Sequence, residues 1–240
     1  MSVIGTLVEV TLRSLLGRRR MVLLILLVSV PVLIGVIVRL SGGRPDPDRV
    51  LDALVVRTVM PLVALVLGTA ALGSEIEDGT AVYLMVKPIA RWRIALAKIA
   101  VAAALTATLI IPSIVVTGLL VGGAGSASLG STFAFALACL IGGSAYAAAF
   151  VTLSVFTSRA LLLGLAYTLL WEGALAGLLE GTRFLSIRQA TLGLAAGFGA
   201  DIPGDQLAFA VSVVVLTTVL IGSFLLATWR LDRFEIRGSD

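Results

Sequence analysis

Apolar and polar stretches alternate along the chain on the scale of a membrane helix. Apolar runs occupy residues 21–40, 54–72, 94–120, 132–156, 160–179 and 207–229. Each is close to the length of about 20 residues that an α-helix needs to cross the hydrocarbon core of a bilayer. The pattern therefore predicts an all-α integral membrane protein with six transmembrane helices, formed as a single domain over residues 1–240.

A different pattern precedes the first of these spans. Residues 2–17 place small and charged side chains on one side of a helix and apolar side chains on most of the rest. Such a pattern is typical of a helix that lies in the membrane interface. Arg18, Arg19 and Arg20 follow directly, and a basic cluster beside a span marks the cytoplasmic side.

The remaining basic residues agree with this orientation. With six spans and Arg18–Arg20 inside, both termini are cytoplasmic, and twelve of the 18 Lys and Arg residues fall on the inner side. The outer side receives Arg39, Arg44, Arg49, Arg57, Arg183 and Arg188. The inverted topology would place the basic majority outside, against the positive-inside rule.

Residues 180–206 are only partly apolar and carry Arg183, Arg188, Asp201 and Pro203. They are too interrupted to span, so we expect an outer re-entrant segment of one or two partly embedded helices. Residues 122–131 form a glycine-rich outer turn that lacks the Gly-Lys-Ser/Thr ending of a phosphate-binding loop.

Composition supports the membrane assignment and excludes several kinds of chemistry. Charged residues make up 13% of the chain, against about 25% in soluble domains. The net charge of +4 is spread along the chain without an aromatic–basic patch, which argues against nucleic acid as a partner. There is no histidine and a single cysteine, Cys139, so we expect no catalytic residue, no Cys/His metal site and no intrachain disulfide.

The longest polar interruption in the first half of the chain is the loop at residues 75–93. Acidic residues close the preceding helix, and Gly79 permits the turn that ends it. Thr80 can cap a short helix over residues 81–86, which Pro88 then stops. The residues that define this pattern are Glu75, Glu77, Asp78, Gly79, Thr80, Tyr83, Leu84, Lys87, Pro88 and Arg91.

This order of residues resembles the loop between the second and third membrane helices of ABC-2 type transporter permeases. In that family the short helix is the coupling helix, which docks on a separate ATPase subunit. The resemblance covers essentially the whole chain, because the family also has an N-terminal interfacial helix and an outer re-entrant segment. Trp171-Glu172 and residues 184–189 also look similar to bacterial members. The chain departs from some relatives in lacking a large outer domain.

The resemblance implies a permease subunit of an ATP-driven exporter in a bacterial plasma membrane. Two copies would pair with two ATPase subunits, which would bind the ATP and Mg²⁺, and membrane lipids would surround the permease. The chain itself has no Walker A motif, so it cannot hydrolyse ATP by a P-loop mechanism. The substrate, whether drug, peptide, lipid or polysaccharide, stays open, and so do the direction of transport and the choice between a homodimer and a heterodimer.

Other functions fit the sequence less well. An ion-gradient-driven secondary transporter would show inverted repeats, and the halves of this chain show none. A structural or assembly protein would not need the charged, proline-stopped loop. Asp78-Gly79 resembles the start of the CDP-alcohol phosphotransferase motif, but the further aspartates of that motif are missing.

Two of the charged residues that fall inside predicted spans, Arg57 and Glu172, are candidates for a functional role. Glu172 either faces a partner or a cavity, as costly intramembrane carboxylates usually do, or hydrates near the outer interface. Spans two and five line the central pathway in related transporters, so Arg57 and Glu172 are candidates for an ion pair in an outer gate. Small residues at four-residue spacing predict close helix packing, at Ala134, Ala138 and Gly142 and at Gly173 and Gly177.

Overall fold

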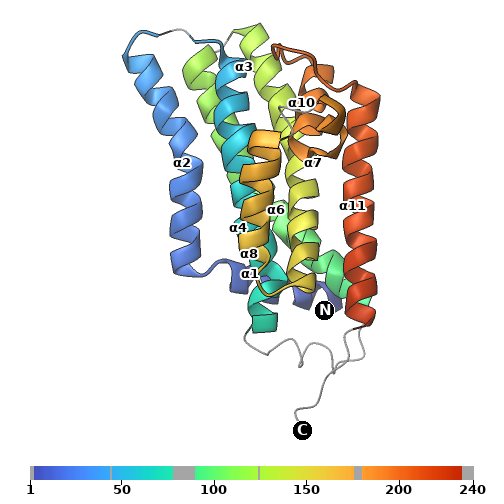
Figure 1. Cartoon of the computed structure of the whole chain (residues 1–240). Coiled ribbons are helices and arrows are strands. Elements are labelled where there is room, and N and C mark those ends of the chain that lie inside the picture. Colours follow the sequence, from blue (N-terminus) through green and yellow to red (C-terminus); the bar gives the residue numbers. More distant parts are fainter. Residues whose placement is uncertain (1–2, 44, 78–89, 124, 176–179, 234–240) are drawn as a thin grey trace.

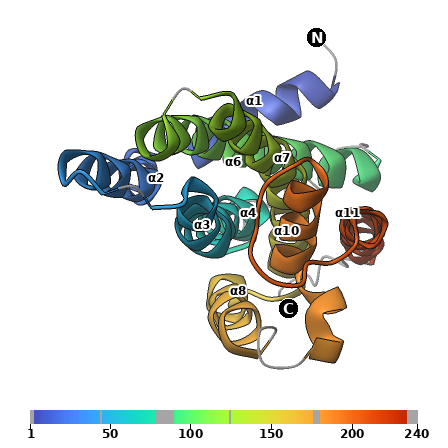
Figure 2. The same cartoon turned by 90° about the horizontal axis from the view of Figure 1, so that it is seen from above.

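The computed structural model describes residues 3–43, 45–77, 90–123, 125–175 and 180–233. Within those ranges the regular structure is helical, and most helices stand side by side in one bundle (Figure 1). The long helices are α2 (Arg18–Leu40), α4 (Met60–Glu77), α6 (Arg91–Gly122), α7 (Ser126–Phe156) and α11 (Phe209–Asp232). Helix α1 (Val3–Leu15) lies across one end of the bundle, as Figures 1 and 2 both show.

Five helical segments of the described chain are long and apolar enough to cross a membrane. They are Arg18–Leu40, Pro47–Gly73, Arg91–Gly122, Ser128–Phe156 and Phe209–Asp232. The expected fifth span at residues 160–179 is represented by a shorter apolar helix, Ala160–Gly173. It consists of α8 (Ala160–Ala166) and the π-helix η2 (Tyr167–Leu175), and residues 176–179 lie outside the described chain.

The second span begins earlier than its hydrophobicity suggests. A continuous helical rod runs through α3 (Pro47–Val50), the π-helix η1 (Leu51–Val59) and α4, whereas the sequence pattern predicts a start at Leu54. The carboxylate of Asp46 accepts a hydrogen bond of 3.0 Å from the backbone N–H of Asp48, and Pro47 occupies the first helical turn. These are start signals for a helix, and they act whether or not the residues that follow are apolar.

The glycine-rich turn between the third and fourth spans is also shorter than expected. Helix α7 begins at Ser126, so part of the predicted turn at residues 122–131 is helical. Gly123 takes a φ of 74°, a conformation that costs glycine little, and this lets the chain reverse within a few residues.

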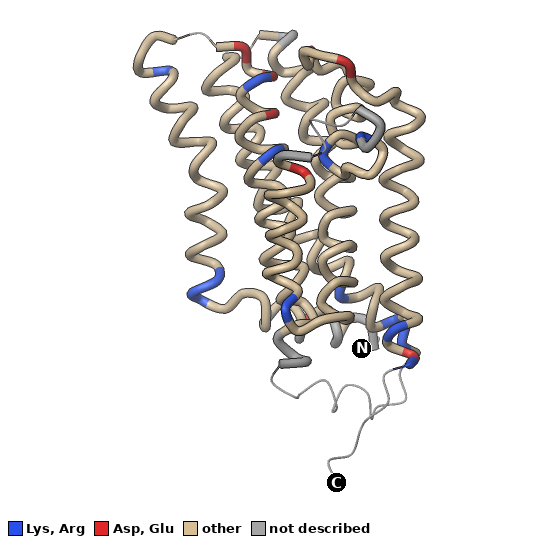
Figure 3. Tube along the Cα trace, in the orientation of Figure 1, with Lys and Arg blue, Asp and Glu red and all other residues tan. Residues whose placement is uncertain are grey.

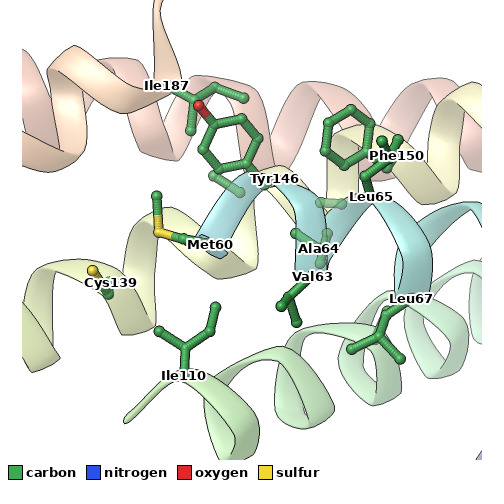
Figure 4. Packing of buried hydrophobic residues seen from close by; sticks show 14 of the residues in the cluster. Met60, Val63, Ala64, Leu65, Leu67, Ile110, Cys139, Tyr146, Phe150 and Ile187 are labelled. Atoms are coloured by element: carbon green, nitrogen blue, oxygen red, sulfur yellow. The ribbon is translucent and has the colours of Figure 1, made fainter. Parts of the chain in front are cut away.

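Helix α7 forms the centre of the bundle and packs against α4, α6, α10 (Ile187–Gly197) and α11. Figure 4 shows its Tyr146 and Phe150 beside Met60, Ala64 and Leu65 of α4. The two helices approach closely at Gly68, where an added Cβ would lie 2.8 Å from the Cβ of Phe150. Protein interiors have little free volume, so such a contact fixes the separation of α4 and α7.

The outward faces of α2 and α11 are apolar. Exposed side chains there include Leu23, Leu26, Ile37, Val214 and Leu225, each more than half exposed. Large exposed apolar surfaces are unusual for a soluble monomer and are normal for helices in contact with lipid. The arrangement is that of a multi-pass membrane protein.

Candidate functional site

Glu172 is the most deeply buried carboxylate in the described part of the bundle, with 2% of its surface exposed. Its oxygens accept hydrogen bonds of 2.5 Å from the Ser186 hydroxyl and 2.8 Å from the Tyr167 hydroxyl. The backbone N–H of Ile187 donates a third bond at 2.9 Å, and that of Arg188 a long one at 3.5 Å. The carboxylate is therefore neither hydrated at the interface nor without partners.

These partners belong to the first turn of α10. Ser186 is the N-cap residue of that helix, and its Oγ accepts a bond of 3.0 Å from the backbone N–H of Gln189. The first N–H groups of an α-helix have no partners within the helix and carry partial positive charge. Glu172 supplies an anionic acceptor to this end, which compensates for much of the cost of burying a carboxylate.

The Tyr167–Glu172 contact depends on the π-helical register of η2. In an α-helix, residues five apart are separated by about 140° around the axis, so their side chains do not meet. In a π-helix the backbone hydrogen bonds join residues five apart, so the side chains of such residues lie on nearly the same face. Tyr167 and Glu172 are five apart within η2, and their side chains bond directly.

The same spacing recurs in η1, where Arg57 pairs with Asp52. The Nη2 of Arg57 lies 3.0 Å from Oδ2 of Asp52, and Nε lies 3.2 Å from both carboxylate oxygens. The side chain of Asp52 is 12% exposed and that of Arg57 is 52% exposed. The pair thus joins two residues of one helix at a partly hydrated surface.

The expected ion pair between Arg57 and Glu172 is therefore not formed. Arg57 is satisfied by Asp52 within its own helix, and Glu172 is satisfied by Tyr167 and the start of α10. The pairing was predicted because spans two and five line the central pathway in related transporters, and that argument does not reveal that each residue has a local partner five positions away.

Tyr146 completes the surroundings of this cluster. It is fully buried on α7, and its hydroxyl points toward Ile187 at the start of α10 (Figure 4). Its oxygen has no hydrogen-bond partner among the described residues. In the sequence, nothing distinguishes Tyr146 and Tyr167 from residues that only pack in the bundle, and Ser186 stands out only as part of the family-like stretch 184–189. The Ser186–Gln189 capping spacing was the one local signal available for the start of α10.

The predicted coupling loop, residues 75–93, lies mostly outside the described residues. Asp78, Gly79, Thr80, Tyr83, Leu84, Lys87 and Pro88 all fall in that part, whereas Glu75 and Glu77 end α4 and Arg91 begins α6. The two helix ends that flank the loop lie at the end of the bundle where basic residues gather (Figure 3). Basic residues at that end include Arg18–Arg20 at the start of α2, Arg159 before α8 and Arg230 near the end of α11.

The small residues chosen for helix packing have two different environments. Ala134, Ala138 and Gly142 are buried on α7, and a Cβ at Gly142 would collide with the side chain of Thr191 in α10. Gly173 is exposed on η2, where the one described atom that an added Cβ would meet is the backbone oxygen of Thr168 in the same helix, and Gly177 lies outside the described residues. The described chain also holds no group of three or more Cys, Asp or Glu residues arranged to bind a metal ion.

We expect Glu172→Gln to lower the free energy of unfolding by about 2 kcal/mol, because a neutral amide accepts more weakly and brings its own donors toward N–H groups. Denaturant titration of the protein in detergent micelles measures this change. Asp205→Asn is the control, since that side chain is exposed and should change stability by less than about 0.5 kcal/mol. Equal stability of the wild type and Glu172→Gln would contradict a capping role for the carboxylate.

Double-mutant cycles should separate the two possible partners of Arg57. Arg57→Gln and Asp52→Asn should show a coupling energy of about 0.5–1 kcal/mol, the range for partly exposed ion pairs. Arg57→Gln and Glu172→Gln should be additive, because each residue has its own partner. The same titrations measure both cycles. A coupling of Arg57 with Glu172 larger than that with Asp52 would show that the arrangement is wrong.

Comparison with known protein families gives this architecture a context. A family model described as ABC-2 family transporter protein matches residues 16–172, from just before α2 to Glu172. The search of curated proteins found no match. The match covers well over half of the chain and includes four of the five long apolar segments. The chain belongs to the ABC-2 family of transporter proteins and is a multi-pass membrane permease component of an ABC transporter.

Proposed function

We propose that this chain is the transmembrane subunit of an ATP-driven exporter in a bacterial plasma membrane. Two copies would associate with two ATPase subunits, and those subunits would bind ATP and Mg²⁺. ABC-2 permeases normally work with an ABC ATPase. The observation that carries the proposal is that the two helix ends flanking this loop, Glu77 of α4 and Arg91 of α6, lie at the basic end of the bundle.

The orientation follows from the same distribution of charge. Basic residues favour the cytoplasmic side of a membrane protein. The opposite end carries acidic residues (Figure 3), among them Asp46 and Asp48 at the start of α3 and Asp201 and Asp205 between α10 and α11. Both termini and the coupling loop would then be cytoplasmic, and α10 would lie in the outer half of the membrane.

A continuous rod connects the two ends. Its cytoplasmic end, at Glu77, enters the coupling loop, and its outer part carries Asp52 and Arg57 in η1. A displacement of the loop by an ATPase would be transmitted along this rod. The close contact of α4 with α7 at Gly68 leaves little free volume in which α4 could deform locally. Alternating access driven from the cytoplasmic side is the mechanism that this layout supports.

The alternative is a secondary transporter driven by an ion gradient. The buried Glu172 is the observation that favours it, because intramembrane carboxylates often carry ions or protons. Transport by the permease alone in proteoliposomes, with an imposed ion gradient and no ATPase, would support that alternative. Dependence on the ATPase and on ATP would support the exporter.

The docking assignment makes a prediction about residues in the loop. Tyr83→Ala or Leu84→Ala should reduce recovery of the ATPase by about tenfold or more, because buried apolar anchors carry most of an interface's affinity. Charge reversal at Glu77 or Asp78 should have a smaller effect, since rim charges mainly tune association. The measurement is co-purification with an ATPase encoded beside the permease.

Ser158→Ala provides the matched control, because Ser158 is exposed in another turn at the same end of the bundle. Its ATPase recovery should equal that of the wild type. If all four loop variants retain the ATPase fully while inserting into the membrane, the loop is not the docking element.

The topology predicts which positions are accessible from outside the cell. In a Cys139→Ala background, single cysteines at Gly43 and Ser126 should react with a membrane-impermeant thiol reagent added to intact cells. Cysteines at Thr80 and Ser158 should react only after the membrane is permeabilised. Labelling at Thr80 in intact cells would reverse the orientation and remove the coupling role.

A further inference from the structure

We propose that the outer half of the bundle contains a binding site for a phosphate group. A cavity of about 300 Å³ lies between η1, η3 (Glu180–Leu185), the start of α10 and the segment that precedes α11. Its polar lining includes Asp52, Arg57, Arg183, Arg188, Gln189 and Gln206. Three arginines from three different elements meet in this one space.

The charges in this cavity are only partly balanced within the chain. Asp52 neutralises Arg57 at 3.0 Å. Arg183 donates to the backbone carbonyl of Asp205 at 3.3 Å, and a carbonyl oxygen carries no net charge. A second aspartate in the lining, Asp205, is exposed, so three arginines face two aspartates. Arg183 and Arg188 therefore leave the interior of the cavity with an excess of positive charge.

Arg188 is the residue that points to a ligand. It is 5% exposed, and its Nε has no hydrogen-bond partner among the described residues. A guanidinium in a membrane-embedded site is costly unless an anion and hydrogen-bond acceptors accompany it. The nearby carboxylate of Glu172 accepts from the backbone N–H groups at the start of α10 and from two hydroxyls. An anion in the cavity would provide the acceptor for Arg188.

The lining favours phosphate among anions. Arginine presents a planar fork of N–H donors that matches two phosphate oxygens at once. Gln189 and Gln206 add neutral amide groups, and the volume is at the lower end of the range for small-molecule sites. A cavity of this size suits a single phosphate group better than an entire large substrate. The phosphate group of a membrane lipid and that of a small phosphorylated solute offer the same chemistry.

Glu172 positions this site without touching the ligand. By accepting from the N–H of Ile187 and the hydroxyl of Ser186, it fixes the end of α10 from which Arg188 projects. The site belongs to the permease chain itself and needs no ATPase. Phosphate binding can therefore be tested independently of whether the coupling loop docks on an ATPase.

The test is binding to the purified full chain in a non-ionic detergent, without an ATPase. Two probes are used, inorganic phosphate and phosphatidylglycerol in mixed micelles, and native mass spectrometry and calorimetry measure binding. Arg183→Gln and Arg188→Lys should each weaken binding by about tenfold, because each removes charge-assisted bonds. Arg39→Gln is the matched control, since Arg39 is exposed at the same end of the bundle and lines a different cavity.

Either source of phosphate supports the proposal, and the two probes distinguish them. Binding of phosphatidylglycerol that inorganic phosphate displaces assigns the site to a lipid headgroup. Binding of inorganic phosphate alone assigns it to a soluble ligand. Absence of binding by both probes, or equal binding by the wild type and both arginine variants, overturns the proposal. If Arg188→Lys does not fold, as judged by its unfolding curve without probe, Arg183→Gln decides the result.

Discussion

The position of α10 depends on the carboxylate of Glu172. A buried carboxylate and an uncapped helix start are both unfavourable in a membrane interior, because neither finds water there. In this structure they satisfy each other: the first N–H groups of α10 donate to Glu172, and Ser186 adds its hydroxyl. The interaction joins η2, where the family match ends, to the segment beyond it. The contact fixes the start of α10, which carries Arg188, while packing against α7 and α11 holds the rest of the helix.

The two π-helical segments, η1 and η2, each contain a hydrogen-bonded pair of polar side chains. Asp52–Arg57 in η1 and Tyr167–Glu172 in η2 are both separated by five residues. In a regular α-helix these side chains would point about 140° apart. Because π-helical segments occur mainly as local features at functional sites, their presence here marks this region as distinct from the regular α-helical half that ends at Glu77 and Arg91. The same register that provides Arg57 with a partner also orients it toward the cavity.

The sequence allowed the large-scale features to be predicted, because they depend on hydrophobicity summed over about 20 residues. Summed hydrophobicity is sufficient to predict an all-helical membrane protein and to locate the five long apolar spans. The partners of Arg57 and Glu172 do not, because they depend on a local π-register and on where Ser186 starts a helix. The start of the second span is marked in the sequence by Asp46-Pro47, a helix-start signal that a hydrophobicity pattern does not detect. The contact between Gly142 and Thr191 joins distant positions and has no local signal beyond the small residue itself.

The rod formed by α3, η1 and α4 relates the proposed cytoplasmic and outer sites. Energetic coupling between distant sites requires an element that both sites bias between two arrangements. The α4 part is held against α7 at Gly68, where backbone and side-chain atoms leave no space, so it moves as a unit. The η1 part buries Leu51, Val55 and Val59 and packs against α2, α6 and α10, while its Asp52–Arg57 ion pair lies within the segment itself. If an ATPase acts on the loop after Glu77, the motion it imposes will therefore pass through α4 with little loss. Because α4 continues directly into η1, the same motion would shift Arg57 relative to Arg183 and Arg188, which line the same cavity from η3 and α10.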